Sequence, residues 1–254
     1  MKKSFKKRKS NFLNIYGINP TVSLLNYKPE LICEMRVARK TTNERLLQII
    51  SMSENLGITV QEFNKDTLDK IACNSKHQGV VATIRAPNFK NINHLKVDAP
   101  LISTTSTIAI LDSIEDTGNL GAAIRTSYAA GINSIIIKQE GSAKINEHVF
   151  KSSVGAIFNV NLYIVPNINQ AIDIIKSAGF WVIGLDEKSD QSIYEYLFDK
   201  KVAIIMGSES KGLRSLTTKN CDHILSIPMN SSLDSLNVSV ALGIVAFEIN
   251  RQRN

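Results

Sequence analysis

The chain has 254 residues, of which 43% are hydrophobic and 21% are charged, and its formal net charge is +7. This composition is typical of a globular protein and excludes wholesale disorder. At roughly 150 residues per domain, the length favours two small domains over one large one. No apolar run approaches the roughly 20 residues that a membrane-spanning helix needs, so we predict no membrane partner.

The cysteines and histidines argue against a metal site. Cys33, Cys73 and Cys221 are too far apart for a Cys-x-x-Cys motif or a dense disulfide framework. The four histidines show no metal-ligand spacing; they are His77, His94, His148 and His223. We therefore predict no metal, and the reduced cysteines predict a cytoplasmic protein.

Most of the positive charge lies at the amino terminus. Six of the seven excess charges fall within the first ten residues, which contain no acid. A secretory signal would need an apolar core after the basic stretch, and here Asn11 and Asn14 interrupt it. We assign residues 1–12 to a flexible basic arm. Two interpretations stay open: an arm that contacts phosphates, or a solubilising terminus without a specific partner.

Residues 13–86 alternate short helices and short strands and predict a small α/β domain. The predicted elements are a helix from Asn19 through Leu25, a strand over 31–37, a helix capped by Asn43 and ended by Gly57, a strand over 58–60, a helix over about 66–73 and a strand over 80–84. Residues 87–106 are polar, lack a clear period and contain two prolines, which is typical of a linker.

Predicted strands and helices alternate again over residues 107–254, and their apolar patterns are clearer there. The predicted strands are 108–111, 134–137, 161–165, 181–185, 202–206 and 224–227. Most are continuous apolar runs, as in strands covered on both faces, and helices lie between them. One of these helices carries the apolar period Ile168, Ala171, Ile172 and Ile175. The pattern predicts a mostly parallel sheet with crossover connections.

The last predicted helix, 236 to about 250, is apolar nearly all round. Such a helix needs burial on more than one side, either in the domain core or against a partner chain.

The common nucleotide and hydrolase motifs are missing. No Gly-x-Gly turn occurs, which argues against a dinucleotide-binding or ordinary Rossmann methyltransferase site. The segment 207–212 has the wrong residue order for a phosphate-binding P-loop, and there is no Gly-x-Ser-x-Gly elbow.

Three polar loops at the carboxyl ends of predicted strands remain as candidates: 115–121, 207–212 and 228–237. We call them the first, second and third motif loops. Each has an ordinary structural explanation. Asn119 is a plausible N-cap of the helix that carries Arg125, and Arg125 lies off the apolar stripe of that helix. Glu209 could be an exposed acid, and Ser235 or Asn237 could cap the last helix.

Taken together, the three loops resemble the three motifs of the SpoU/TrmH family of RNA ribose 2′-O-methyltransferases, within the SPOUT superfamily. The matching stretches are Asn119-Leu-Gly-Ala-Ala-Ile-Arg-Thr-Ser, Ile205-Met-Gly-Ser-Glu-Ser-Lys-Gly-Leu, and Ser226-Ile-Pro-Met with Ser235-Leu-Asn-Val-Ser-Val-Ala-Leu-Gly. The third is the most specific. Tyr16-Gly-Ile-Asn-Pro and His77-Gln-Gly-Val-Val-Ala are similar to signatures of the ribosomal-protein-like RNA-binding domain of that family.

The resemblance implies a carboxyl-terminal α/β domain tied in a trefoil knot, a homodimer, and S-adenosylmethionine as methyl donor. By position, the residues implied to line the donor pocket are Gly207, Ile227, Leu236 and nearby Met229. The family pattern places Arg125 at the 2′-hydroxyl, with Asn119, Glu209, Ser235 and Asn237 holding the guanidinium and the ribose. An arginine is a poor base, so we favour stabilisation of the developing alkoxide and positioning.

We therefore predict a methyltransferase that acts on a nucleotide, most simply guanosine, in large-subunit (23S) ribosomal RNA. Three alternatives stay open: a transfer-RNA substrate, a non-catalytic RNA-binding or ribosome-assembly protein, and a metabolic α/β enzyme with a basic tail. Ser210 and Lys211 stand where many members have Gly-Glu or Gly-Arg, and Thr117 replaces a frequent proline.

Overall fold

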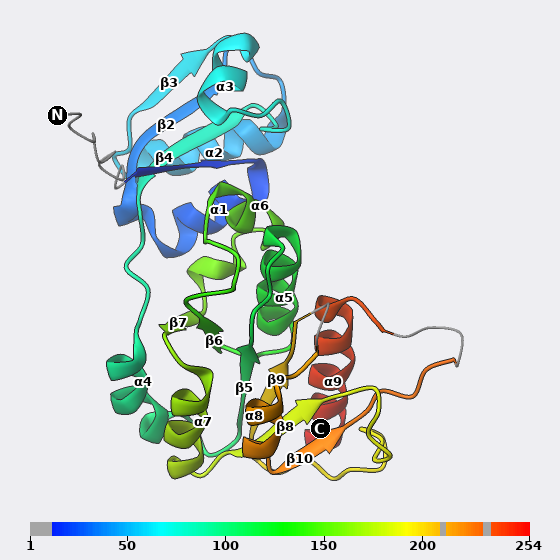
Figure 1. Ribbon diagram of the computed structural model, residues 1–254. Helices are drawn as coiled ribbons and strands as arrows, with labels where there is room; N and C mark the ends of the chain where they lie inside the picture. Colours follow the sequence, from blue (N-terminus) through cyan, green and yellow to red (C-terminus); the bar gives the residue numbers. More distant parts are fainter. Residues whose placement is uncertain (1–11, 209–211, 231–234) are drawn as a thin grey trace, which may run out of the picture. The chain divides into compact units, whose positions relative to one another are not determined.

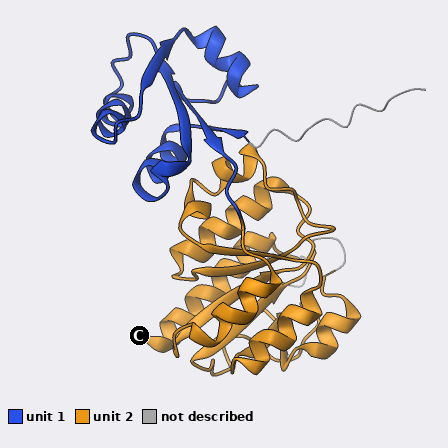
Figure 2. Ribbon diagram, turned by 90° about the vertical axis from the view of Figure 1, so that its left-hand side faces the viewer, with its two compact units in different colours: residues 1–88 blue, residues 89–254 orange. Residues whose placement is uncertain are grey.

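The computed structural model describes residues 12–208, 212–230 and 235–254. The chain divides into two compact units, residues 1–88 and residues 89–254, which are coloured separately in Figure 2. Most of the basic arm predicted over residues 1–12 lies outside the described residues. No helix in the described part of the chain is long and apolar enough to cross a membrane.

Unit 1 is a four-stranded sheet with three helices (Figure 1). Its elements are β1 (Phe12–Tyr16), α1 (Ile18–Tyr27), β2 (Ile32–Ala38), α2 (Glu44–Asn55), β3 (Val60–Phe63), α3 (Lys65–Ala72) and β4 (Val80–Arg85). The strand order is β1-β4-β2-β3, with β4 antiparallel to both β1 and β2 and β3 parallel to β2. Asn43 caps α2 as predicted, because its side chain accepts hydrogen bonds from the N–H groups of Arg45 and Leu46.

Two features of unit 1 differ from the prediction. Strand β1 was missed, since Asn11 and Asn14 obscured its alternation and we assigned residues up to 12 to the arm. In the structure Asn14 is an internal residue of β1, where its side chain binds the Ile71 carbonyl and the Thr83 hydroxyl. Strand β3 lies two to three residues later than expected. Leu56 and Gly57 form a turn, and two residues without regular structure follow before the strand begins.

Unit 2 is a six-stranded sheet in the order β10-β8-β9-β5-β6-β7, and every strand pair in it is parallel. The strands are β5 (Ser106–Leu111), β6 (Ser134–Lys138), β7 (Asn161–Val165), β8 (Trp181–Leu185), β9 (Lys201–Met206) and β10 (His223–Leu225). All six predicted strands are confirmed, within one or two residues at their ends. Parallel pairing is possible because long crossover connections, rather than tight hairpins, join the strands that follow one another in the chain.

Helices cover both faces of this sheet (Figure 1). They are α4 (Ile92–Asp98), α5 (Thr117–Ala129), α6 (Glu147–Ser152), α7 (Ile168–Ser177), α8 (Ser215–Asn220) and α9 (Val238–Arg253). Ile108 and Ile110 of β5 belong to a core cluster with α4 and α7, whereas Ala109 and Leu111 are buried but lie outside that cluster. Alternate residues of one strand therefore pack on opposite faces, which explains the continuous apolar runs.

The segment predicted to be a linker, 87–106, is not one for most of its length. It contains α4 and a 3₁₀ turn at Ala99–Leu101, and the side chains of Leu95 and Ala99 are fully buried in the core of unit 2. Lys90 also pairs with Tyr163 of β7. The polar sequence hid this helix because only one side of it, at Leu95 and Ala99, is apolar and buried.

Candidate active site

The strand order of unit 2 brings two of the motif loops together. From β5 the chain builds outward through β6 and β7, and it then crosses to β8 and β9 on the other side of β5. In a parallel sheet, the crevice at such a reversal, at the carboxyl ends of the strands, is the usual ligand site. The first and second motif loops follow β5 and β9, which are hydrogen-bonded neighbours. A ligand site is therefore expected near the carboxyl ends of β5 and β9.

The first motif loop leads directly into α5, whose N-cap is Asp116 and not Asn119. The Asp116 carboxylate accepts a hydrogen bond of 2.7 Å from the Asn119 backbone N–H. Asn119 lies inside the first turn, so its side chain is free of the capping role that the sequence allowed. A Cβ at Gly121 would lie 1.9 Å from the Ser152 hydroxyl, so this glycine admits the close approach of α6.

The first and third motif loops meet through a pair of asparagines. The Asn237 side chain donates a hydrogen bond of 2.9 Å to the Asn119 side-chain oxygen, across 118 residues of sequence. The Asn237 oxygen also accepts from the Ser239 backbone N–H at 2.9 Å, so Asn237 is the N-cap of α9. The capping role and the contact with Asn119 therefore coexist in one side chain.

Arg125 lies in the middle of α5 with an exposed side chain, off the buried stripe of that helix as predicted. It makes no hydrogen bond or ion pair with any residue in the described ranges, Asn119 and Asn237 included. Within the described ranges, no side chain occupies its guanidinium. Glu209, which was expected to hold this guanidinium, lies outside the described residues.

A cavity of about 410 Å³ opens at the carboxyl ends of β8 and β9. Its lining includes all four residues expected at the donor pocket, Gly207, Ile227, Met229 and Leu236, and also Ser235. Gly207 is required by the loop itself. A Cβ there would lie 2.2 Å from the Gly212 carbonyl carbon, since Ser208 and Gly212 pair through their backbones and close the loop.

The cavity also contains residues that the sequence did not single out. Asp186, Glu187 and Lys188 line it directly after β8, together with apolar side chains such as Leu185 and Met206. They carry no recognisable motif. The available signal was their place at the carboxyl end of a predicted strand, and only the sheet order shows that β8 lies beside β9.

This mixture of groups fits S-adenosylmethionine. The apolar side of the cavity can cover an adenine ring, and carboxylate and ammonium side chains can pair with ribose hydroxyls and with a charged amino-acid tail. The volume is within the range of small-molecule sites, about 300–1,000 Å³. Among the described residues, no group of three metal-ligating side chains is present.

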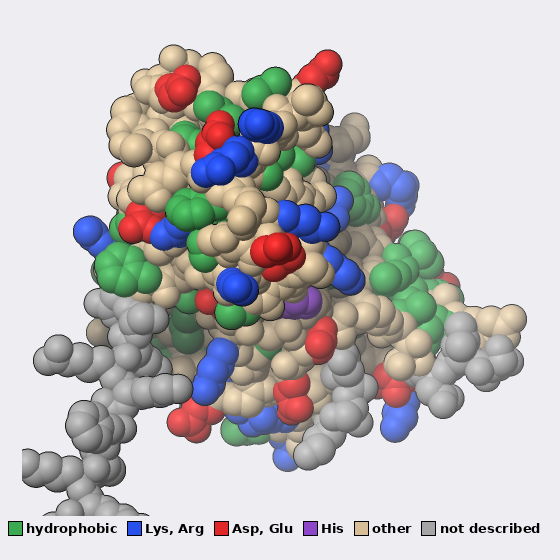
Figure 3. Space-filling view, turned by 90° about the horizontal axis from the view of Figure 1, so that it is seen from above, with side chains coloured by type: hydrophobic (Ala, Val, Ile, Leu, Met, Phe, Trp, Pro, Cys, Tyr) green, Lys and Arg blue, Asp and Glu red, His purple; other side chains and the backbone are tan. Residues whose placement is uncertain are grey.

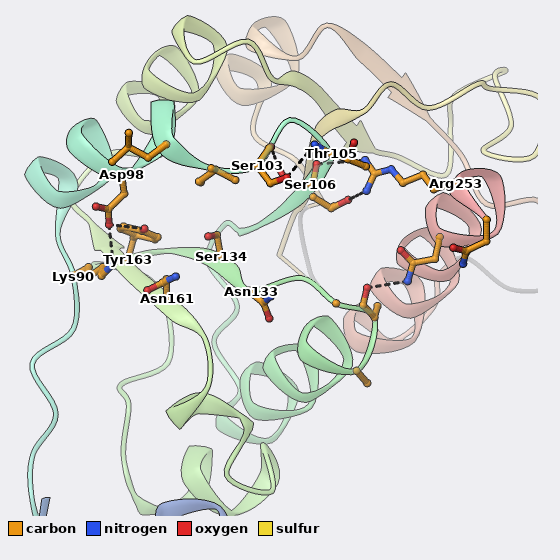
Figure 4. A pocket seen from close by; sticks show the side chains of 18 residues that line it. Lys90, Asp98, Ser103, Thr105, Ser106, Asn133, Ser134, Asn161, Tyr163 and Arg253 are labelled. Atoms are coloured by element: carbon orange, nitrogen blue, oxygen red, sulfur yellow. Dashed lines mark hydrogen bonds and ion pairs between the residues drawn. The ribbon is translucent and has the colours of Figure 1, made fainter. Parts of the chain in front are cut away.

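A second and larger cavity, about 850 Å³, lies at the opposite edge of the sheet (Figure 4). It is lined by Ser106, Ser134 and Asn161, the first residues of β5, β6 and β7. Its charged groups are already paired within the chain. The Arg253 guanidinium donates to the Thr107 hydroxyl at 2.9 Å and to the Lys200 carbonyl at 2.8 Å.

At the other end of this cavity, the Asp98 carboxylate accepts hydrogen bonds of 2.8 Å from both Lys90 and Tyr163 (Figure 4). These bonds hold the pKa of Asp98 below its usual value. Burial, together with the neighbouring carboxylate, raises the pKa of the Tyr163 phenol. None of the predicted site residues lines this cavity, so the smaller cavity is the better candidate despite its size.

Two family models match the chain. The SpoU rRNA methylase family matches residues 106–247, and the substrate-binding domain of RNA 2′-O ribose methyltransferases matches residues 14–90. The first range lies within unit 2, and the second covers most of unit 1.

Curated relatives match over nearly their whole length. The 23S rRNA (guanosine-2′-O-)-methyltransferase RlmB of Haemophilus influenzae is 37% identical over 94% of this chain and 97% of its own. The protein of the same name from Escherichia coli K12 is 34% identical over 94% and 98%.

Solved structures share the fold. The SpoU methyltransferase AviRb from Streptomyces viridochromogenes, in complex with AdoMet, aligns with a TM-score of 0.80 at 20% identity, over 98% of this chain and 94% of its own. An AdoMet-bound rRNA methyltransferase from Sinorhizobium meliloti aligns with a TM-score of 0.78 at 23% identity, over 95% and 87%. The predicted α/β class with a parallel sheet and a small amino-terminal domain is confirmed. From its family match and these relatives, the chain belongs to the SpoU rRNA methylase family.

Proposed function

We propose that this protein transfers a methyl group from S-adenosylmethionine to the ribose 2′-hydroxyl of a guanosine in 23S ribosomal RNA. The observation that carries the proposal is the meeting of the three motif loops at one edge of the sheet. There the Asn237–Asn119 hydrogen bond lies at the start of α9, and the cavity that contains the expected donor residues includes Ser235, Leu236 and Val238 of the same segment.

The donor supplies a methyl group already activated on a sulfonium. The chain has to bind it, exclude water and place the hydroxyl oxygen in line with the methyl carbon. We assign donor binding to Gly207, Ile227, Met229 and Leu236, with Asp186 and Lys188 at the polar end of the cavity.

On the acceptor side, Asn119 and Asn237 orient the ribose, and Arg125 stabilises the negative charge that develops on the 2′-oxygen. The exposed, unpaired guanidinium of Arg125 supports this role, because none of its donors is used within the described chain. Ser235 lines the donor cavity two residues before Asn237, and we assign it, with the two asparagines, to the acceptor side. Glu209 keeps its proposed role of holding the guanidinium.

The RNA substrate is expected to contact unit 1, which matches a substrate-binding family. In residues 12–88, nine Lys and Arg stand against seven Asp and Glu. Figure 3 shows the two signs interspersed over the face that it presents. A surface with so small an excess of positive charge attracts phosphates weakly. We therefore assign the basic arm, residues 1–12, to phosphate contacts.

We also propose a homodimer. On α9, Val240 and Phe247 are 50% and 53% exposed, and Ile244 lies between them at helical spacing. Leu242, Val245 and Ile249 on the other side of the helix are buried. The exposed stripe is the face that a second copy would cover, and it explains why the helix is apolar on two sides.

The trefoil knot implied by the family belongs to the same proposal. The segment 186–193 runs beside the chain that leaves β10 in a parallel bridge, where Ser226 N–H donates to the Gln191 carbonyl at 2.8 Å and Ile193 N–H donates to the Ser226 carbonyl at 2.9 Å. From there the chain returns to α9, which packs against α5. The family resemblance carries the proposal of the knot, and these contacts of the carboxyl-terminal segment with earlier parts of the chain support it. With ribosomal RNA as substrate, we expect the protein to act in the cytoplasm.

A transfer assay with radiolabelled S-adenosylmethionine tests the function, with deproteinised ribosomal RNA and transfer RNA offered separately. We expect label in ribosomal RNA, at a guanosine whose 3′ linkage resists alkali because the 2′-oxygen is blocked. Label in transfer RNA alone would keep the reaction and overturn the substrate. No label in either RNA or in ribosome-assembly intermediates, together with tight RNA binding, would favour a non-catalytic protein.

A further inference from the structure

A polar network that no motif covers lies where the chain leaves β5 and where it enters α8; Asp112, Ser113 and Thr217 in it are buried, and Arg214 is exposed. The Asp112 carboxylate accepts a hydrogen bond of 2.9 Å from the Ser113 hydroxyl and one of 3.4 Å from the Thr217 hydroxyl. The Arg214 guanidinium donates to the Ser113 hydroxyl oxygen at 2.9 Å. Ser113 is thus a bridge between Asp112, after β5, and Arg214, after the second motif loop.

The burial of three members of this network is unusual for such polar groups. Asp112, Ser113 and Thr217 are 3%, 5% and 1% exposed. A carboxylate removed from water is costly unless hydrogen bonds compensate for the lost hydration, and here two hydroxyl groups do so. Ser113 also has a backbone φ of 64°, in the left-handed region that residues other than glycine rarely adopt. A serine at a position that suits glycine indicates that its hydroxyl is needed.

A third segment meets the same point. A Cβ at Gly141, in the loop after β6, would lie 3.5 Å from the Ser113 hydroxyl oxygen and 3.9 Å from the Arg214 guanidinium. The neighbouring Ala143 N–H donates to the Ile114 carbonyl at 2.7 Å. The segments that follow three adjacent strands, β9, β5 and β6, are therefore tied together around Ser113.

We propose that Asp112, Ser113 and Arg214 are positioning residues that hold the first motif loop in register with the second. The inference rests on the proposed methyl transfer. Residues 112–116 lead into α5, which carries Asn119 and Arg125, and Arg214 directly follows the turn that closes the donor cavity at Gly212. The network fixes the distance and angle between the acceptor side and the donor side of the site.

Cutting this link lowers the rate of the chemical step and leaves the binding of each ligand intact. In-line transfer depends on the approach of two reacting atoms, and a misplacement of about 1 Å costs on the order of 100-fold in rate. Donor and RNA each contact one side of the site, so their affinities depend little on the register between the sides.

Ser113→Gly is the central variant. Glycine accepts a φ of 64° without strain, so this change removes the hydroxyl and relieves the backbone. We expect the single-turnover rate to fall roughly 10- to 100-fold, while the dissociation constants for donor and RNA stay within about twofold. Asp112→Asn and Arg214→Gln should behave alike. Combining Ser113→Gly with Arg214→Gln should add little to either change, because both cut one link.

Ser134→Ala is the matched control. Ser134 is a buried serine of the same sheet, 7% exposed, at the amino end of β6. Its loss should leave the rate unchanged. Hydrogen exchange of the peptides spanning 112–119 and 212–218 supplies a readout independent of activity. Exchange should rise in all three network variants and stay as in the native protein in the control.

Unchanged exchange in Ser113→Gly would overturn the positioning role, even if the native protein methylated no RNA and the proposed function failed. A rate within twofold of the native rate would also overturn it. So would a loss of donor or RNA affinity that accounts for the whole loss of rate.

Discussion

The bond between Asn237 and Asn119 gives the sharpest test of the site, because Asn237 has two separable roles. It caps α9 through its side-chain oxygen, and it donates to Asn119 through its side-chain nitrogen. Serine caps helices about as well as asparagine but is too short to reach Asn119. Asn237→Ser therefore cuts the contact between the motif loops and keeps the cap. Asn237→Ala removes both.

The expected magnitudes follow from these contacts. A lost N-cap costs about 1 kcal/mol, and a hydrogen bond between two uncharged side chains contributes about 0.5–1.5 kcal/mol. The free energy of unfolding of unit 2 should fall by about 2 kcal/mol in Asn237→Ala and by about 1 kcal/mol or less in Asn237→Ser. For a domain of this size, each kcal/mol lowers Tm by about 2–4 °C.

The two variants should differ in stability but not in activity. If the Asn237–Asn119 pair orients the ribose, both variants should lose methyl transfer by about tenfold or more, although Asn237→Ser is nearly as stable as the native protein. Single-turnover transfer to ribosomal RNA and thermal denaturation measure the two effects separately. Asn167→Ala is the matched control, since Asn167 caps α7 in the same way and contacts none of the predicted site residues. It should lose stability and keep its rate.

One result would refute this reasoning. If Asn237→Ser transferred methyl groups within twofold of the native rate, the contact between the motif loops would have no part in orienting the acceptor. Equal stability of the serine and alanine variants would show separately that the cap contributes nothing to α9.

Four further predictions concern the rest of the site. Arg125→Ala should lower the transfer rate on the order of 100- to 1,000-fold, because it removes a hydrogen-bond donor to the developing oxyanion. The affinity for S-adenosylmethionine, measured by calorimetry, should not change. An unchanged rate would exclude Arg125 from the chemistry. Gly207→Ala should abolish donor binding, since its Cβ would lie 2.2 Å from Gly212. Gly179→Ala, with no atom within 4 Å of the new Cβ, should bind donor normally. Phe247→Glu should shift the protein from dimer to monomer in sedimentation velocity, and an unaltered dimer would move the interface away from α9. Deleting residues 1–10, with their six basic side chains, should weaken RNA binding and reduce the slope of log Kd against log salt concentration by up to about four. An unchanged slope would mean that the arm only increases solubility.

Local sequence pattern was sufficient for much of unit 2. The apolar runs that became β5 to β9 are continuous, and helices separate most of them, so each of these strands could be predicted within one or two residues. The pattern failed where an element is polar on most of its surface. Helix α4 and the turn after it bury only Leu95 and Ala99 fully, and β1 carries Asn14 inside it. In both, contacts with distant residues decide the structure, and no local signal reports them.

For the site, the sequence by itself determined the residue types and their order along the chain. The motif stretches around Asn119, Gly207 and Asn237 were sufficient to indicate the family and the donor. Only the tertiary structure decided which of them touch. It placed Asn237 against Asn119, left Arg125 without a partner in the described chain, brought Asp186 to the donor cavity and joined Arg214 to Ser113. The physical reason is that a parallel sheet orders its strands by long crossover connections, so neighbours at its carboxyl edge come from segments that are far apart in sequence.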